Sequence, residues 1–267
     1  MAIDYFFLTE SGVQLRSELE LTDEAVQEAR AKGEIVKCLA LRCLKRKVLF
    51  AHVVPCKGAD ENGIVADMVL QDVEWLGHTR LILKADREPA IQALVKAALT
   101  MIKVDCSHVE QASAETPPTY DSQANGGIEV GIRILRGTLR TIKMCLEQRI
   151  DRYIPVAHPV VEWMLEHACL LVNALVRGED GITAWERTRG RPFSQQLVGF
   201  GEVVLYRYPT KGPQHDPHGN IGAQGGEGIF LGYNRSSSTF VVGTPDGHWI
   251  ETRSAMGLRV TDRVSIQ

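Results

Sequence analysis

Apolar residues recur along this chain with two different periods, and each period predicts its own kind of element. Short runs rich in β-branched and aromatic residues, bounded by charged or glycine-containing segments, predict strands. Runs in which apolar residues return every three or four positions predict helices with one buried face. In the first half of the chain we expect strands at residues 2–8, 35–44, 48–54, 79–85 and 102–109, and helices at 59–76 and 89–101.

This order of strands and helices predicts an α/β fold in which helices flank a mixed sheet. Residues 9–33 are polar and helix-permissive, and we interpret them as an insertion or a helical excursion. Residues 110–127 lack periodicity and contain two adjacent prolines, which predicts a mobile loop. Three further helices are expected, a long one that carries Glu129 in its first turn and shorter ones at 159–176 and 183–189.

The pattern changes near residue 200. Short strand-like runs are separated there by stretches rich in glycine and proline, which is typical of a small β-barrel. The expected strands are 202–207, 228–233, 239–243 and 248–253. We therefore expect two domains, an α/β domain over residues 1–198 and a small β domain over residues 199–267.

The formal net charge of -3 at pH 7 argues against a protein that binds nucleic acid over its whole surface. A local basic track is compatible with this charge, because residues 131–152 hold six cations against two acids. The six cysteines form no CxxC pair and complete no zinc pattern with the eight histidines. The sequence shows no signal peptide and no apolar run of bilayer length. We expect a soluble intracellular protein, cytoplasmic or nuclear, with free and mostly buried thiols and no membrane partner.

The long helix carries two parallel stripes. On one side Glu129 and four cations repeat at alternating spacings of four and three, so all five share one side of the helix. These cations are Arg133, Arg136, Arg140 and Lys143. One position earlier runs an apolar stripe that predicts a core-facing seam, formed by Ile128, Ile132, Leu135, Leu139, Ile142 and Leu146. The stripes suggest a metal-binding acid beside a phosphate-binding track; the alternative is an amphipathic helix with a basic solvent face.

Two aspartates upstream of Glu129 stand where α/β sheets gather their ligands. Asp4 falls inside the first predicted strand, and Asp86 follows the carboxyl end of a later one. Three carboxylates at one sheet edge would suit Mg²⁺ or Mn²⁺, and two such ions would support phosphoryl transfer. Each acid also has a structural alternative: Asp4 as a strand-end cap, Asp86 as the N-cap of the following helix and Glu129 as a first-turn acid favoured by the helix dipole.

The three acids stand in motifs that resemble the Asp, Asp, Glu catalytic core of retroviral and retrotransposon integrases, which belong to the ribonuclease H-like superfamily. The motifs are Ile3-Asp4-Tyr5-Phe6-Phe7, Lys84-Ala85-Asp86-Arg87-Glu88-Pro89-Ala90 and Asp121-Ser122-Gln123-Ala124-Asn125-Gly126-Gly127-Ile128-Glu129. The segments 179–187, 200–206 and 228–233 resemble the linker and SH3-like barrel that follow this core in copia-type polyproteins. The likeness spans nearly the whole chain, and the 42 residues between Asp86 and Glu129 are somewhat more than the family usually has.

The resemblance implies a role for each residue of these motifs. Asp4, Asp86 and Glu129 would be catalytic ligands of two Mg²⁺ or Mn²⁺ ions, and Asn125 would touch DNA near the scissile phosphate. The cations of the stripe, Arg133, Arg136, Arg140 and Lys143, would hold phosphates. The implied protein is a homo-oligomeric enzyme that cleaves DNA 3′ ends and joins element ends to target DNA. Because the family's amino-terminal zinc-binding module is not part of this sequence, we expect a unit of a longer polyprotein.

Two positions depart from the family pattern. Arg87 stands where Asn commonly follows the second aspartate, and Val130 stands where a polar residue usually follows the glutamate. A guanidinium beside Asp86 could compete with a metal ion for that carboxylate. Two alternatives therefore stay open, a catalytically inactive remnant that still binds nucleic acid, and a ribonuclease H-type nuclease that acts on RNA–DNA hybrids.

Two smaller features have plain structural interpretations. Lys45, Arg46 and Lys47 form a basic turn between two predicted strands, which is a solvated hairpin tip by default and a DNA contact in the alternative. Trp163 and His167 lie one helical turn apart, and this spacing favours a core histidine beside a tryptophan over a pair of metal ligands.

Overall fold

A computed structural model describes the chain except for residues 20, 117–125, 210–222 and 258–267. It divides into two compact units. The first consists of Met1–Lys143 and Arg152–Phe193, and the second of Met144–Asp151 and Ser194–Gln267. The expected division of the chain into independent domains at residue 198 stays a prediction.

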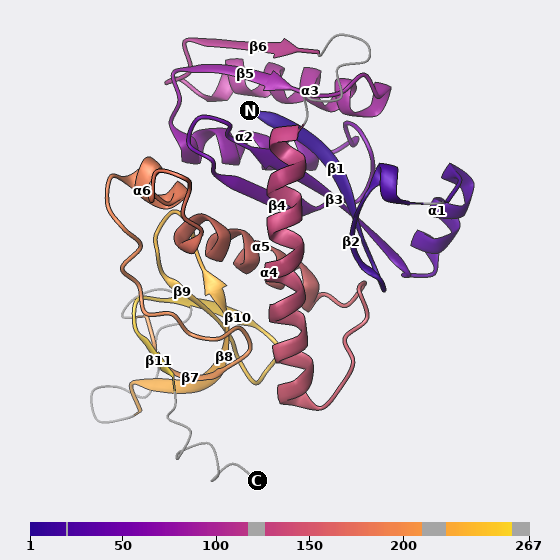
Figure 1. Ribbon diagram of the computed structural model, residues 1–267. Helices are drawn as coiled ribbons and strands as arrows, with labels where there is room; N and C mark the ends of the chain where they lie inside the picture. The colour runs from indigo at the N-terminus through magenta and orange to yellow at the C-terminus, as the bar shows by residue number, and fades with distance from the viewer. Residues whose placement is uncertain (20, 117–125, 210–222, 258–267) are drawn as a thin grey trace. The chain divides into compact units, whose positions relative to one another are not determined.

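The first unit contains a six-stranded mixed sheet (Figure 1). Its strand order is β4-β3-β1-β5-β6, and β2 pairs with β1 beside this path. Strands β2, β3 and β4 pair antiparallel with their neighbours, whereas β5 runs parallel to β1 and β6 runs parallel to β5. The strands are β1 (Ala2–Thr9), β2 (Gly12–Leu15), β3 (Ile35–Arg42), β4 (Leu49–Val53), β5 (Arg80–Lys84) and β6 (Gln111–Glu115). The expected mixed α/β sheet with flanking helices is confirmed.

Two helices cover one face of this sheet. Ile3 and Tyr5 of β1 and Leu39 and Leu41 of β3 are buried in one cluster with apolar side chains of α2 and α3. Because side chains alternate between the faces of a strand, Ala2, Asp4 and Phe6 must point to the other face. The helices that begin in this unit are α1 (Asp23–Ala31), α2 (Ile64–Leu76), α3 (Pro89–Asp105), α4 (Gly126–Ile150), α5 (Val160–Leu175) and α6 (Ala184–Arg189), with a 3-10 turn at Arg16–Glu18.

The face that carries Asp4 packs against α4 and α5. The side-chain amide of Asn173 in α5 pairs with both the backbone N–H and the carbonyl of Leu49 in β4, each at 2.8 Å. A Cβ on Gly131 of α4 would stand 3.1 Å from the Leu49 side chain and 3.0 Å from that of Arg42. Arg42 is the register partner of both Leu49 and Ala2, so these contacts lie on the same face as Asp4.

The structure differs from the expected pattern of elements at three places. Residues 102–109 do not form a strand, because α3 continues to Asp105. The strand beyond it is β6, which lies in the segment expected to be a mobile loop and pairs with β5. Strand β2 lies in the segment interpreted as an insertion or a helical excursion. β6 and β2 are short, and β6 is largely exposed, so neither has the apolar alternation that predicts a strand.

The second unit contains a five-stranded antiparallel sheet with the order β10-β9-β8-β7-β11. Val204, Phe230 and Val242 are fully buried in it, and the rings of Phe230, Tyr233 and Phe240 contact one another. Closure of this sheet into the expected barrel stays a prediction. The strands are β7 (Val203–Arg207), β8 (Gly225–Tyr233), β9 (Phe240–Gly243), β10 (Trp249–Thr252) and β11 (Ala255–Gly257).

The described residues bear on two expectations, one about membrane-spanning helices and one about the cysteines. None of the helices in the described ranges is long and apolar enough to cross a membrane. All six cysteines lie in described segments as free thiols, and only Cys145 is exposed. The prediction of free and mostly buried thiols is therefore confirmed.

Candidate active site

Asp4 lies inside β1, and Asp86 lies two residues beyond the end of β5, the parallel strand next to β1. Ala2 of β1 is the register partner of Lys84 of β5, and each aspartate follows its member of that pair by two residues. The two aspartates therefore lie on adjacent chain segments although 81 residues of sequence stand between them. Asp4 lies inside β1, so the alternative of a strand-end cap is wrong.

Glycines bring the start of α4, and with it Glu129, close to this part of the sheet. A Cβ on Gly127 would stand 2.6 Å from the side chain of Leu44, too close for a carbon atom unless one of the groups shifts. Glycine, which has only a hydrogen atom there, fits without a shift. The guanidinium of Arg42, at the end of β3, donates to the carbonyl of Gly127. Glu129 lies in the first turn of α4, two residues after Gly127 and two before Gly131. This position also agrees with the alternative of an acid favoured by the helix dipole.

The carboxylate of Asp4 shows how close these acids are. Burial raises the pKa of Asp4, and the negative charge of Asp86 raises it further. The backbone N–H of Tyr5, which donates to the carboxylate at 2.8 Å, acts in the opposite direction, and Glu129 and Glu88 add smaller upward contributions. The resulting pKa of Asp4 is about 7. The charged side chains that shift it are all carboxylates, so Asp4 stands in a field of negative charge.

Asp86 and Glu88 together form the turn between β5 and α3. One carboxylate oxygen of Asp86 accepts from the backbone N–H of Glu88 at 3.0 Å, which is an Asx turn. The N-cap of α3 is Glu88, so the alternative of Asp86 as N-cap is wrong. Glu88 forms an ion pair with Lys57. Glu88 was not predicted as a member of the acidic group, although its place two residues after Asp86 was a usable signal.

The chemistry of these donors fits a hard divalent cation, because carboxylate oxygens are the ligands that Mg²⁺ and Mn²⁺ prefer. Their arrangement is less complete. Within the described residues, no three His, Cys, Asp or Glu side chains stand together as a group that could hold a metal ion. Coordination by Asp4, Asp86 and Glu129 would therefore require their side chains to turn toward a common point.

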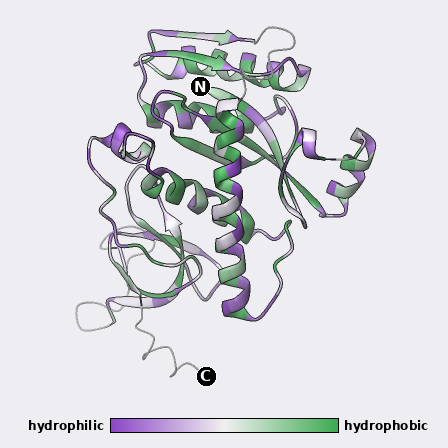
Figure 2. Ribbon diagram, viewed as in Figure 1, coloured by the Kyte–Doolittle hydropathy of each residue, from purple (hydrophilic) through white to green (hydrophobic). Residues whose placement is uncertain are grey.

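The two stripes of α4 lie as the sequence indicates, and Figure 2 shows the alternation of apolar and polar residues along this helix. The six residues of the apolar seam are all buried, with at most 9% of the side chain of any one exposed to solvent. Fully burying a side chain of this size stabilises a fold by roughly 1.5–3 kcal/mol. The seam thus fixes which side of the helix the cations occupy.

The four cations of α4 have different surroundings. Arg133 and Arg140 are exposed. The guanidinium of Arg136 donates to the carboxylate of Glu18, in the 3-10 turn after β2. The ammonium of Lys143 lies 4.3 Å from the centre of the Tyr153 ring, a cation–π contact. Asn125, the predicted DNA contact in the loop before α4, lies outside the described residues.

Comparison with solved structures shows a structural likeness at low sequence identity. The chain is similar to a chain in the cryoEM structure of the simian T-cell lymphotropic virus intasome in complex with PP2A regulatory subunit B56 gamma. The identity is 12%, the TM-score is 0.36, and the match covers 84% of this chain and 76% of that one. No family model matches the chain, and no curated protein does.

Proposed function

We propose that this chain is an integrase of a retroelement, a DNA-processing enzyme that uses Mg²⁺ or Mn²⁺ and acts on DNA 3′ ends and on target DNA. In this proposal the first unit is a ribonuclease H-like catalytic core and the second an SH3-like domain. The chain would be a segment of a longer polyprotein and would act as a homo-oligomer. The two compact units and the mixed sheet of the first agree with this architecture.

One observation carries the proposal. Asp4 lies in β1, Asp86 lies just beyond the adjacent parallel strand β5, and Glu129 lies in the first turn of α4. The negative charges of Asp86 and Glu129 both raise the pKa of Asp4. Packing like charges together costs energy in a folded protein, and such clusters are found where a cation or a reaction requires them. When bound there, divalent cations would activate an attacking oxygen and stabilise a leaving one in phosphodiester chemistry.

The side chains of the protein would bind and orient the DNA. Arg133 and Arg140 are exposed on the helix that carries Glu129, and their planar guanidinium groups suit phosphate oxygens. The glycine contacts of Gly127 and Gly131 fix the start of that helix against the sheet. Phosphates held along α4 would therefore lie next to the acids, which is the positioning that phosphoryl transfer needs.

A second candidate function is a nucleic-acid-binding protein without catalytic activity. Arg87 next to Asp86 favours it, and so does the absence of a formed group of three ligands within the described residues. Such a protein would keep the exposed arginines of α4 and bind DNA, but divalent cations would produce no turnover.

A strand-transfer assay with fluorescent DNA ends and added Mg²⁺ or Mn²⁺ separates these functions. We expect wild-type activity, and a loss of at least about 100-fold in Asp86→Asn, because the substitution removes a charged ligand. Asp105→Asn is the matched control, since Asp105 is an exposed aspartate at the end of α3. Equal rates in wild type and Asp86→Asn would refute the integrase proposal. DNA binding without turnover in any variant would support the second candidate, and cleavage of RNA–DNA hybrids alone would point to a ribonuclease H-type nuclease.

A further inference from the structure

The basic turn between β3 and β4 is built onto the carboxyl end of α2. The guanidinium of Arg46 donates to the carbonyl of Leu76, the last residue of α2, at 2.6 Å. This bond gives Arg46 a structural role, because cations stabilise helix C-termini. Lys45 and Lys47 on either side of it are exposed, so the turn presents their ammonium groups to solvent.

Lys47 adopts an unfavourable backbone conformation in this turn. Its φ is 63°, in the left-handed region that glycine and asparagine adopt more easily than lysine. The backbone N–H of Lys47 donates to the carbonyl of Cys43 at 2.7 Å, which fixes the conformation. The turn thus places the Lys47 side chain at a position whose backbone conformation is strained for lysine.

The end of α6 adds Arg189 to the same place, and Arg191 follows just beyond the helix. Trp185 of α6 contacts Trp75 of α2, with 6.0 Å between ring centres. The guanidinium of Arg189, one helical turn after Trp185, lies 4.4 Å from the centre of the Trp75 ring and 5.8 Å from that of Trp185. Arg189 thus stacks above the end of α2, where Arg46 is also anchored, and Arg191 follows it by two residues.

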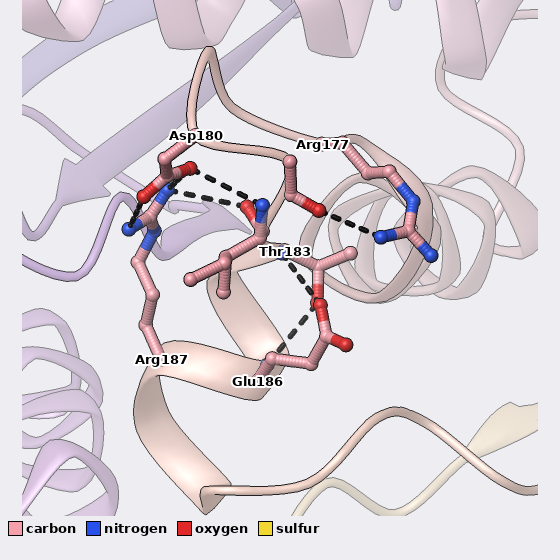
Figure 3. A network of polar contacts seen from close by, with 7 residues as sticks. Arg177, Asp180, Thr183, Glu186 and Arg187 are labelled. Atoms are coloured by element: carbon pink, nitrogen blue, oxygen red, sulfur yellow. Dashed lines mark hydrogen bonds and ion pairs between the residues drawn. The ribbon is translucent and has the colours of Figure 1, made fainter.

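A polar network holds the start of α6 in position (Figure 3). Thr183 and Glu186 form a reciprocal capping box at the N-terminus of the helix. Arg187 donates with two nitrogens to both carboxylate oxygens of Asp180, and Arg177 donates to the carbonyl of Gly181 at 2.6 Å. These groups face each other across the loop before α6 in Figure 3. The helix is therefore a fixed support for its basic end.

The charges of these segments act on one another. The pKa of Arg189 is lowered by burial and then by the charges of Arg191 and Arg46. The pKa of His78, just beyond α2, is lowered by burial and then by Arg46 and Lys45. The turn, the end of α2 and the end of α6 thus form one concentration of positive charge. We call it the turn surface; it consists of Lys45, Arg46, Lys47, Arg189 and Arg191.

We infer that the turn surface binds the phosphate backbone of duplex DNA as a second contact beside the acidic site. This inference rests on the proposed function, which supplies the DNA. Leu44, the residue before the basic triplet, contacts Gly127 of α4, two residues before Glu129. A duplex held along α4 would therefore have the turn surface next to the start of that helix. Cations gathered at one place on the surface are suited to a polyanion, which they bind through its phosphates.

The test compares two triple variants of the full chain, each of which removes two lysines and one arginine that are exposed. Lys45→Ala/Lys47→Ala/Arg191→Ala removes cations of the turn surface but keeps the structural Arg46. Lys96→Ala/Lys103→Ala/Arg80→Ala is the matched control, with its substitutions on α3 and β5. The affinity for a fluorescent DNA duplex is measured by anisotropy at several salt concentrations, in EDTA so that no turnover occurs. Circular dichroism checks that both variants fold.

We expect the slope of log affinity against log salt to become shallower by about 0.9 for each lost phosphate contact, so by roughly two to three in the first variant. Its affinity at ~0.1 M salt should fall about tenfold or more. The control should keep the wild-type slope. Equal slopes in the two variants would overturn the inference, and so would a loss confined to an RNA duplex of the same sequence.

The result is independent of the integrase proposal. If wild type performs strand transfer and the salt slopes do not differ, only the turn surface is refuted. If the slope changes as expected and wild type shows no turnover, the catalytic proposal fails while the turn surface stands as a DNA contact.

Discussion

Glu18 forms an ion pair with Arg136 of α4, one of the cations that would bind DNA phosphates in the proposed function. Its carboxylate accepts from Arg136 and from the backbone N–H of Leu15, the latter at 2.8 Å. The Leu15 bond, then Arg136 and to a lesser degree Arg133 lower the pKa of Glu18, so it carries a negative charge beside two of the predicted phosphate contacts. We expect Glu18→Gln to increase the affinity for duplex DNA a few-fold at low salt, with a salt slope steeper by about one, because Arg136 becomes available to a phosphate.

The control for this variant is Glu28→Gln. Glu28 lies in α1 and forms an ion pair with Lys32, four residues further along the helix. Both substitutions remove one negative charge, so a general electrostatic effect would raise the affinity equally in the two variants. Such equality in the anisotropy titration would contradict direct competition between Glu18 and DNA.

At the level of single residues, the sequence indicates which side chains are candidates for a site, but it does not indicate which side chains pair with each other. The acids Asp4, Asp86 and Glu129 can be chosen from their places at a strand, a strand end and a helix start. The ion pair of Arg136 cannot, since Glu18 lies 118 residues away and surface charges have no periodic signal. For the same reason the sequence alone does not distinguish the four cations of α4. In the structure, Arg136 forms an ion pair with Glu18, and Lys143 forms a cation–π contact with Tyr153.

Two glycines inside α4 have opposite surroundings and allow a matched test at the level of the element. Nothing lies within 4 Å of a Cβ added at Gly137, so Gly137→Ala should gain helix propensity and raise the free energy of unfolding by about 1 kcal/mol. At Gly131 the added Cβ would press on Arg42 and Leu49, and overpacking of this kind costs roughly 1–3 kcal/mol. We expect Gly131→Ala to lose stability on balance, measured by urea unfolding, and to slow strand transfer because Glu129 shifts. If Gly131→Ala raised the free energy of unfolding as much as Gly137→Ala, α4 would not need the close approach of Gly131 to Arg42 and Leu49.

Elements with a regular apolar period were predictable, and polar or very short ones were not. The apolar seam of α4 and the hairpin of β3 and β4 match the sequence pattern closely. β6 has the sequence Gln-Ala-Ser-Ala-Glu and is mostly exposed, so its strand conformation comes from pairing with β5. The tertiary contact overrides local preference there, as is common in strands at the edge of a sheet.

At the level of the whole molecule, His167 makes stability depend on pH. It is buried in α5, with 4% of its surface exposed, and burial lowers its pKa from 6.5 to about 4. Between these two values the unfolded chain binds a proton that the folded protein does not. The folded state therefore loses stability as the pH falls through 6.5, and the loss is complete near pH 4. Each pH unit in this window corresponds to about 1.4 kcal/mol, so the contribution of His167 between pH 7 and pH 5 is roughly 2 kcal/mol.

Urea unfolding of wild type and His167→Leu at pH 7 and pH 5 measures this contribution. The difference between the two proteins matters, because other groups that titrate in this range, Asp4 among them, cancel in it. Relative to wild type, His167→Leu should become more stable by roughly 2 kcal/mol on going from pH 7 to pH 5, whatever its stability at pH 7. The control His108→Gln removes an exposed histidine and should follow the wild-type curve. If His167→Leu also follows that curve, His167 takes up a proton inside the folded protein, and the interior around α5 must be more open to water than its burial indicates.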